Sequence, residues 1–243
     1  MSELLEKIGQ LQHIIDTSER IVFFGGAGVS TESGIPDFRS EDGLYRQKYK
    51  YNPETILSHT FFMQKTSEFY EYYRDKMVVT DVAPNITHHF LARLEAAGKL
   101  TGVITQNIDG LHQAGGSKKV TELHGSIHRN YCMKCHTFYP LSAVTESADI
   151  PRCTCGGIIK PDVVLYEESL NEEDINQALS LISVADTLIV GGTSLSVYPA
   201  ASFLRYFSGK HLVLINKSAT SYDANADLLI QAGLGEVFSK LHI

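Results

Sequence analysis

Residues 21-IVFFGGAGVSTESGIPDFR-39 decide the fold. The apolar residues 21–24 predict a short buried strand, and the glycine-rich residues 25–28 follow it directly. A strand that ends in a glycine turn is typical of a nucleotide-binding α/β unit, in which backbone N–H groups at the next helix hold a phosphate. Taken alone, residues 26–31 fit an ordinary tight turn equally well, because Thr31 stands where the dinucleotide motif has its third glycine.

Further short apolar runs repeat this pattern along the chain. The runs 102-GVITQN-107, 187-TLIVGG-192 and 211-HLVLIN-216 are separated by helix-like stretches at 86–97, 171–184 and 199–207, and residues 3–18 have the apolar spacing of an amphipathic helix. Such alternation predicts an α/β fold with a Rossmann-type, doubly wound parallel sheet. Each run ends in Gly, Asn or Gln, at the sheet edge where ligands of open α/β sheets bind.

Two segments interrupt the alternation. Residues 36–85 are rich in Tyr and Phe and partly helical in pattern, and residues 126–160 contain all the cysteines. We therefore expect a Rossmann-type domain formed by residues 1–38, 86–125 and 161–243. A smaller inserted domain would combine a helical insertion (39–85) with a zinc-binding module (126–160).

The four cysteines form two pairs, Cys132 with Cys135 and Cys153 with Cys155. Clustered cysteines in a sequence that shows no secretion signal indicate metal rather than disulfides, and four thiolates fill the tetrahedral shell of one structural Zn²⁺. The second pair has one intervening residue where two are usual, and the glycines at 156 and 157 allow a tight turn there. The alternatives are four buried reduced thiols, or His128 or His136 in place of one cysteine.

The composition excludes several other classes of protein. The 243 residues carry a net charge of −7 without a run of Lys or Arg, which disfavours nucleic-acid binding. No segment approaches the roughly 20 consecutive apolar residues that span a bilayer, and the first residues do not resemble a secretion signal. We expect a cytoplasmic protein without a membrane partner; nothing in the sequence indicates its oligomeric state.

The extended string GAGVSTESGIPDFR at 26–39, together with 105-TQNIDGLHQAGGSKKVTELHG-125, resembles the signatures of the sirtuin family in its bacterial form. Three later segments, 160-KPDVVLYEE-168, 192-GTSLSVYP-199 and 215-INKSAT-220, are similar to its substrate-binding and NAD-binding segments. Glu167 departs from the pattern, because glycine is common at that position. The resemblance covers nearly the whole chain.

The resemblance implies an NAD-dependent protein-lysine deacetylase that releases nicotinamide, deacetylated lysine and O-acetyl-ADP-ribose. His124 would act as the general base, because imidazole titrates near neutral pH, and Asn107 would help to position the catalytic groups. Val163 and Val164 would face an acyl-lysine peptide that adds as a strand. By the same resemblance, the NAD-binding residues are Ala27, Thr31, Phe38, Arg39, Gln106, Ile108, Asp109, His124, Thr193, Ser194 and Asn216.

Two questions about the reaction remain open at the level of sequence. Sirtuins that prefer acidic acyl groups carry a Tyr in the helical insertion and an Arg three residues after it. In this chain Tyr73 occupies the position of that Arg, and Arg74 follows it. We therefore expect deacetylation rather than preference for another acyl group. The alternatives are a protein mono-ADP-ribosyltransferase on the same scaffold, which an intact His124 disfavours, and a non-catalytic NAD-sensing module.

Overall fold

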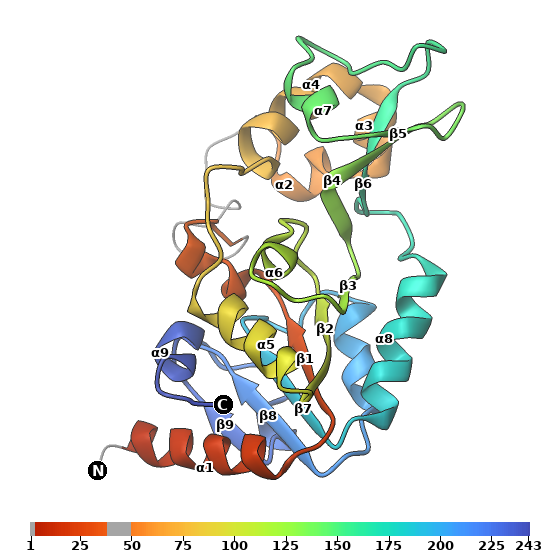
Figure 1. Ribbon diagram of the computed structural model, residues 1–243. Helices are drawn as coiled ribbons and strands as arrows, with labels where there is room; N and C mark the ends of the chain where they lie inside the picture. The colour runs from red at the N-terminus through yellow and green to blue at the C-terminus, as the bar shows by residue number, and fades with distance from the viewer. Residues whose placement is uncertain (1–2, 38–49) are drawn as a thin grey trace.

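The computed structural model describes residues 3–37 and 50–243, which form a larger and a smaller lobe (Figure 1). The larger lobe contains a parallel six-stranded sheet in the order β3-β2-β1-β7-β8-β9. This arrangement confirms the predicted α/β fold. The strands are β1 (Ile21–Gly25), β2 (Leu100–Thr105), β3 (Val120–Glu122), β7 (Thr187–Gly191), β8 (His211–Ile215) and β9 (Leu228–Ile230).

Alternate residues of the strands face two separate apolar cores, one on each side of the sheet. Phe23 of β1 packs with the core that includes α1, α5 and α9, whereas Val22 and Phe24 pack with the core that includes α8 and η5. The parallel strands are thus covered on both faces, which explains their uninterrupted apolar runs. The helices of this lobe are α1 (Glu3–Thr17), α5 (Ile86–Ala96), α6 (Leu111–Ala114), α8 (Glu172–Val184) and α9 (Leu234–Phe238), with 3₁₀ turns η1 (Ala27–Val29), η2 (Thr31–Ser33), η5 (Ala200–Tyr206) and η6 (Asp223–Asn225).

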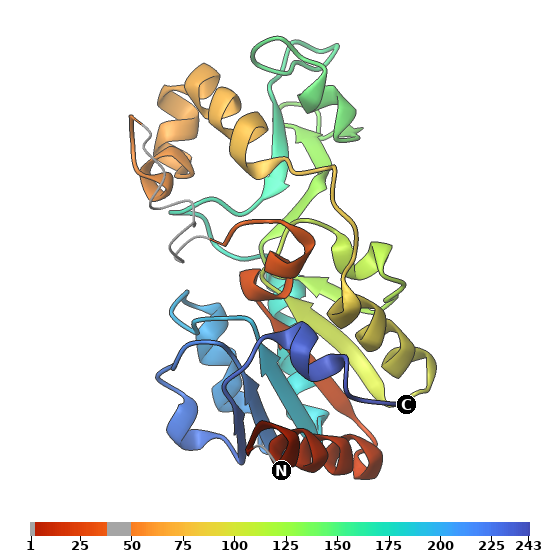
Figure 2. The same cartoon turned by 90° about the vertical axis from the view of Figure 1, so that its left-hand side faces the viewer.

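The smaller lobe joins the two interrupting segments through one shared core. Phe62 and Tyr70 of the helical segment pack with Ile127 and Val163 of the small sheet, all buried. Figure 2 shows this lobe beyond the carboxyl ends of the parallel strands, with the loop after β1 between the lobes. Its elements are α2 (Pro53–Ile56), α3 (His59–Gln64), α4 (Thr66–Tyr72), the π-helical turn η4 (Tyr73–Met77), α7 (Ser142–Thr145), and the antiparallel strands β5 (Phe138–Tyr139), β4 (Gly125–Cys132) and β6 (Ile159–Val163).

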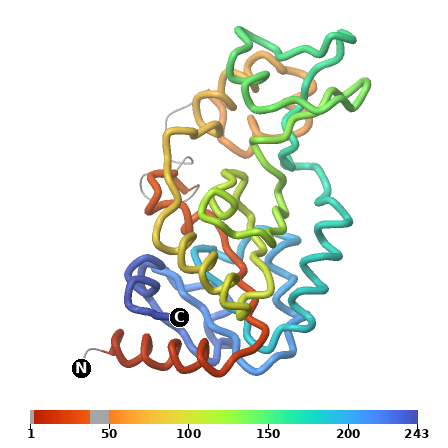
Figure 3. Tube along the Cα trace, viewed as in Figure 1, coloured from red at the N-terminus to blue at the C-terminus, as the bar shows by residue number. Residues whose placement is uncertain are grey.

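The boundary expected at residue 161 is wrong by a few residues. Asp162 and Val163 lie in β6 and pair with Ser126 and Gly125 of β4, so they belong to the small sheet rather than to the larger one. Local apolar pattern cannot reveal this, because it does not identify a strand's partner. Figure 3 traces the chain between the lobes, where the connecting residues are 78–85 between η4 and α5, 123–124 between β3 and β4, and 164–171 between β6 and α8.

The turn after β1 also differs from expectation. The glycine run leads into two short 3₁₀ turns, η1 and η2, where the start of a helix was expected. Gly34 ends the second turn with φ 92°, a left-handed conformation that favours glycine. Within the two described ranges, every helix is too short or too polar to cross a lipid bilayer.

Two histidines to which the sequence pattern gives no role are buried side by side in the larger lobe. His88 of α5 and His112 of α6 lie with ring centroids 4.8 Å apart, and they are 0% and 1% exposed. Neither ring nitrogen of His112 has a hydrogen-bond partner among the described residues. Burial lowers the pKa of His88 to about 4 and that of His112 to about 3, and each is lowered further by a neighbouring histidine.

This pair makes the fold sensitive to acid. Both rings stay neutral in the folded chain, whereas in the unfolded chain they take up protons below their ordinary pKa of 6.5. Each ring therefore lowers the free energy of unfolding by about 2 kcal/mol at pH 5 relative to the value well above pH 6.5. We expect His112→Leu to remove about half of the pair's contribution, measured by urea unfolding at pH 7 and pH 5. His13→Ala, at an exposed position, is the control; an unchanged pH dependence in His112→Leu would refute the assignment.

Candidate active site and metal centre

The loops after β1 and β7 are in backbone contact at the carboxyl edge of the sheet. The Gly28 N–H donates to the Gly192 carbonyl at 2.8 Å, and a Cβ on Gly28 would lie 2.7 Å from the Gly192 Cα. Glycine is therefore required by the close approach of two backbones. Ala27 and Thr31 are half-buried in the first loop, where the Thr31 hydroxyl donates to the Gly28 carbonyl at 3.1 Å. Phe38 and Arg39 lie outside the described residues.

A serine of the first loop connects it to the loop after β2. The buried Ser30 hydroxyl donates to Asp109 Oδ2 at 2.7 Å and accepts from Asn107 Nδ2 at 3.0 Å. Asp109 Oδ1 also accepts from the Leu111 N–H at 2.9 Å, so both carboxylate oxygens are held. Ser30 is a site residue that the sequence pattern did not single out. The signal that could have found it is its hydroxyl, which stands in the glycine loop between Ala27 and Thr31.

His124 lies in the two-residue connection between β3 and β4. Its Nδ1 is 2.9 Å from the Gln106 carbonyl oxygen. Because a carbonyl can only accept, Nδ1 carries a proton, and in the neutral ring Nε2 is the basic nitrogen. Burial lowers the pKa of His124, opposed by this hydrogen bond, so the neutral form is favoured at pH 7. The ring therefore has the tautomer of a general base.

Backbone geometry fixes this position of His124. Gly125 has φ 78°, and a Cβ there would overlap the Asp162 carbonyl oxygen of β6. The His124 carbonyl accepts from the Val164 N–H at 3.0 Å, which ties the connection to the end of β6. Glycine is thus required after His124 at the junction between the two sheets, and the backbone of His124 is held there whatever its side chain.

A chain of polar side chains runs along the strand ends away from His124. The Gln106 N–H donates to the Gly25 carbonyl at 3.0 Å, and Gln106 Nε2 donates to Thr193 Oγ1 at 3.1 Å. The Thr193 N–H in turn donates to Asn216 Oδ1 at 3.0 Å. The Asn216 side-chain nitrogen is buried without a partner among the described residues. A buried donor without a partner fits a site that accepts a polar ligand. Ser194 is exposed beside it, its hydroxyl 2.6 Å from that of Ser196.

The backbone carbonyls of Ile108 and Asp109 are contacted by residues of β4 at a point where the pairing of that strand is irregular. The pairing of β4 with β6 shifts between Ser126 and Asn130, and the Ile127 N–H donates to the Ile108 carbonyl at 3.0 Å. His128 Nε2 lies 3.1 Å from the Asp109 carbonyl oxygen, which places His128 at this loop and away from the cysteines. Bulges of this kind commonly re-aim residues near functional sites.

The segment expected to bind substrate is a strand only in its first part. Val163 is buried in the core of the smaller lobe, and Val164 packs against the core on the α8 side of the larger sheet. After Val163 the chain leaves β6, and Tyr166 makes an isolated parallel bridge to Ser58. Nearby, Tyr73 is buried, and Arg74 Nη1 donates to the Asp149 carbonyl at 2.8 Å and to Ser147 Oγ at 3.3 Å.

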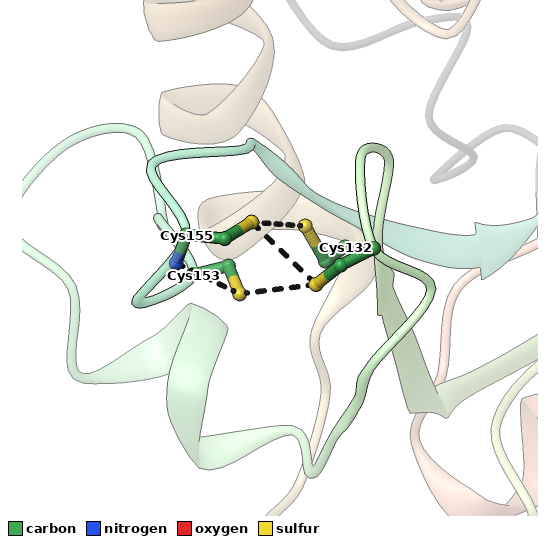
Figure 4. Close-up of side chains that lie close together, drawn as sticks. Cys132, Cys153 and Cys155 are labelled. Atoms are coloured by element: carbon green, nitrogen blue, oxygen red, sulfur yellow. Dashed lines mark hydrogen bonds between the residues drawn. The ribbon is translucent and has the colours of Figure 1, made fainter.

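The four cysteines converge in the smaller lobe, and Figure 4 labels Cys132, Cys153 and Cys155. All four sulfurs lie within 4.8 Å of one another, with separations of 3.5 Å for Cys132–Cys155, Cys135–Cys153 and Cys135–Cys155. A tetrahedron with Zn–S bonds of about 2.3 Å has edges of roughly 3.8 Å, so this set fits a structural zinc ion.

The surrounding backbone is adapted to the cysteine cluster. The Lys134 N–H points to Cys132 Sγ at 3.4 Å, and the Cys155 N–H points to Cys153 Sγ at 3.5 Å. A Cβ on Gly157 would lie 2.6 Å from Cys132 Sγ, so glycine leaves room for the sulfur despite the short spacing of the second pair. Among the described residues, the cluster contains the four cysteines, and neither His128 nor His136 belongs to it.

Similarity to known proteins agrees with this geometry. The model of the Sir2 family matches residues 26–199. A relative from Clostridium acetobutylicum named NAD-dependent protein deacetylase is 60% identical over 98% of this chain and 99% of its own, and one of the same name from Clostridium perfringens is 56% identical over 97% and 98%.

Solved structures give the same result. A structure described as "Structural Basis for the Mechanism and Regulation of Sir2 Enzymes" has a TM-score of 0.88 at 38% identity, covering 97% of this chain and 96% of its own. Another, "Sir2-p53 peptide-NAD+", has a TM-score of 0.87 at 36% identity, covering 96% of each chain. By sequence, fold and arrangement of strand-end residues, this chain belongs to the Sir2 family.

Proposed function

We propose that this chain is an NAD-dependent protein-lysine deacetylase that converts NAD, acetyl-lysine and water into nicotinamide, lysine and O-acetyl-ADP-ribose. The observation that carries the proposal is the tautomer of His124. With Nδ1 donating to Gln106, the basic Nε2 is available to take a proton from a ribose hydroxyl. Relatives that are 54–60% identical and named NAD-dependent protein deacetylase support it.

NAD supplies the ribose that accepts the acetyl group, and residues from three loops would hold it. Asn107, fixed by Ser30, would help to position the reacting groups, since its amide cannot rotate without breaking that bond. The buried unpaired amide nitrogen of Asn216 supports an NAD contact on the side of Thr193. The proposed NAD contacts are Ala27, Thr31, Phe38, Arg39, Gln106, Ile108, Asp109, His124, Thr193, Ser194 and Asn216.

We further propose that the substrates are acyl-lysine side chains of cytoplasmic proteins, bound beside Val163 and Val164. A reducing compartment suits an enzyme whose cysteines serve as zinc ligands. The acyl group should be acetyl, because no cation stands at position 73 to pair with an acidic chain. Tyr73 is fully buried, and Arg74 is held by the carbonyl of Asp149.

Mass spectrometry of the products from NAD and matched acyl-lysine peptides tests this function. We expect nicotinamide, unmodified peptide and O-acetyl-ADP-ribose in equal amounts, with kcat/KM for the acetyl peptide at least roughly ten-fold above that for the succinyl peptide. A buried carboxylate without a cationic partner accounts for this difference. Faster turnover of the succinyl peptide would contradict the acyl preference. Stable transfer of label from NAD to protein would favour the ADP-ribosyltransferase.

A further inference from the structure

The turn at residues 165–168 has a conformation that its sequence does not favour. The Glu168 N–H donates to the Leu165 carbonyl at 3.0 Å, which closes a four-residue turn. Glu167, its third residue, has φ 75°, in the left-handed region that turns of this kind normally reserve for glycine. A residue with a Cβ remains there only when neighbouring contacts hold it.

Those contacts come from the start of α3. The first three N–H groups of α3 have no partner within the helix. The His59 N–H donates to the Tyr166 carbonyl at 3.0 Å, and the Thr60 N–H donates to Glu167 Oε2 at 2.9 Å. The Phe61 N–H donates to Ser58 Oγ at 3.1 Å. Two of the three donors are therefore taken by residues 166 and 167.

Glu168 fixes the other side of the same turn. Its Oε2 accepts from the Leu165 N–H at 2.9 Å and from Lys160 Nζ at 3.1 Å, while Oε1 lies 2.9 Å from His59 Nδ1. Glu168 thus links β6 to α3, whereas the contacts of the Glu167 carboxylate are with Thr60, at the start of α3. Hydrogen bonding to Thr60 lowers the pKa of Glu167, so its carboxylate is ionised at neutral pH.

We propose that Glu167 is a positioning residue for peptide binding, which fastens the segment after β6 to the amino end of α3. The proposal rests on the proposed function, in which Val163 and Val164 lie against the peptide. With the carboxylate in place, residues 164–167 keep one conformation before the peptide arrives. Without it, part of the binding energy orders the turn, so the KM for peptide rises while the KM for NAD does not.

Three substitutions in the full-length, zinc-loaded chain separate the carboxylate from the backbone strain. Glu167→Ala removes the acceptor and keeps the Cβ, Glu167→Gly removes both, and Glu167→Gln keeps an acceptor oxygen. We expect the peptide KM to rise about five-fold in Glu167→Ala, in line with the loss of one hydrogen bond. It should rise less in Glu167→Gly, because glycine adopts φ 75° without strain, and it should return to within about two-fold of wild type in Glu167→Gln. The kcat and the KM for NAD should stay unchanged.

Glu71→Ala is the matched control, since it removes one exposed negative charge from the same lobe. Thermal unfolding distinguishes an effect on peptide binding from an effect on stability alone. A variant that is only less stable would have a lower Tm and an unchanged peptide KM. An unchanged peptide KM in both Glu167→Ala and Glu167→Gly overturns the inference while leaving the deacetylase intact. A wild-type chain that does not turn over NAD with acetyl peptide overturns the proposed function and this inference with it.

Discussion

His124→Ala is expected to lower kcat for deacetylation about 1,000-fold while leaving the affinity for NAD within about two-fold of wild type. General bases typically contribute 10²–10⁴-fold. Alanine removes the only group that we assign to proton transfer, whereas the glycine loop and the Thr193–Asn216 contact remain. The measurements are steady-state turnover of an acetyl-lysine peptide and calorimetric titration with NAD.

The folding of this variant also needs a check, because His124 lies at the junction of the two sheets. Its main contact there is the bond of its backbone carbonyl to the Val164 N–H, which alanine retains. Thermal unfolding should therefore change little. His13→Ala, in the exposed part of α1, serves as the histidine control with full activity expected. Undiminished turnover in His124→Ala would refute the mechanism. Because His124 is also one of eleven proposed NAD contacts, loss of NAD binding would show that this contact, rather than proton transfer, accounts for the lost activity.

Removal of zinc is expected to unfold the tip of the smaller lobe and abolish activity. We expect one zinc per chain by elemental analysis, lost after treatment with a strong chelator or in Cys153→Ser. Zn²⁺ binds structural sites with an apparent free energy of about 10–16 kcal/mol. Where the site forms only in the native state, this binding free energy stabilises the folded state. Hydrogen exchange should then rise over residues 126–163 and much less over the six-stranded sheet.

The loss of activity follows from how the small sheet holds the site. β4 leads directly from Gly125 after His124 into the cluster at Cys132, and β6 returns from the cluster to Val163. His136→Asn is the control, because His136 has φ 57° and asparagine tolerates that conformation; it should keep its zinc. A folded, active chain with four titratable thiols and no metal would contradict the structural role.

The sequence by itself determined the parallel sheet, because its buried strands are continuous apolar runs that end in glycine or amides. It also determined the cysteine cluster, since four cysteines within 24 residues, arranged as two close pairs, are typical of a zinc site. The strand at 21–24 and the helices at 3–18, 86–97 and 171–184 were predicted to within three residues of their observed ends. The roles of single residues in binding NAD and substrate stay predictions.

Only the tertiary structure decided which distant groups meet. The three-residue strands β3 and β9 are too short for a periodic signal, and they form because neighbouring strands offer backbone partners. Ser30 joins Asn107 and Asp109, and residues 161–163 pair with β4, through contacts that no local pattern encodes. Glu167 adopts a glycine-like conformation because the Thr60 N–H, more than 100 residues away in sequence, needs an acceptor. Periodicity reports which face of an element is apolar, whereas hydrogen-bond partners across the fold are chosen only once the chain is packed.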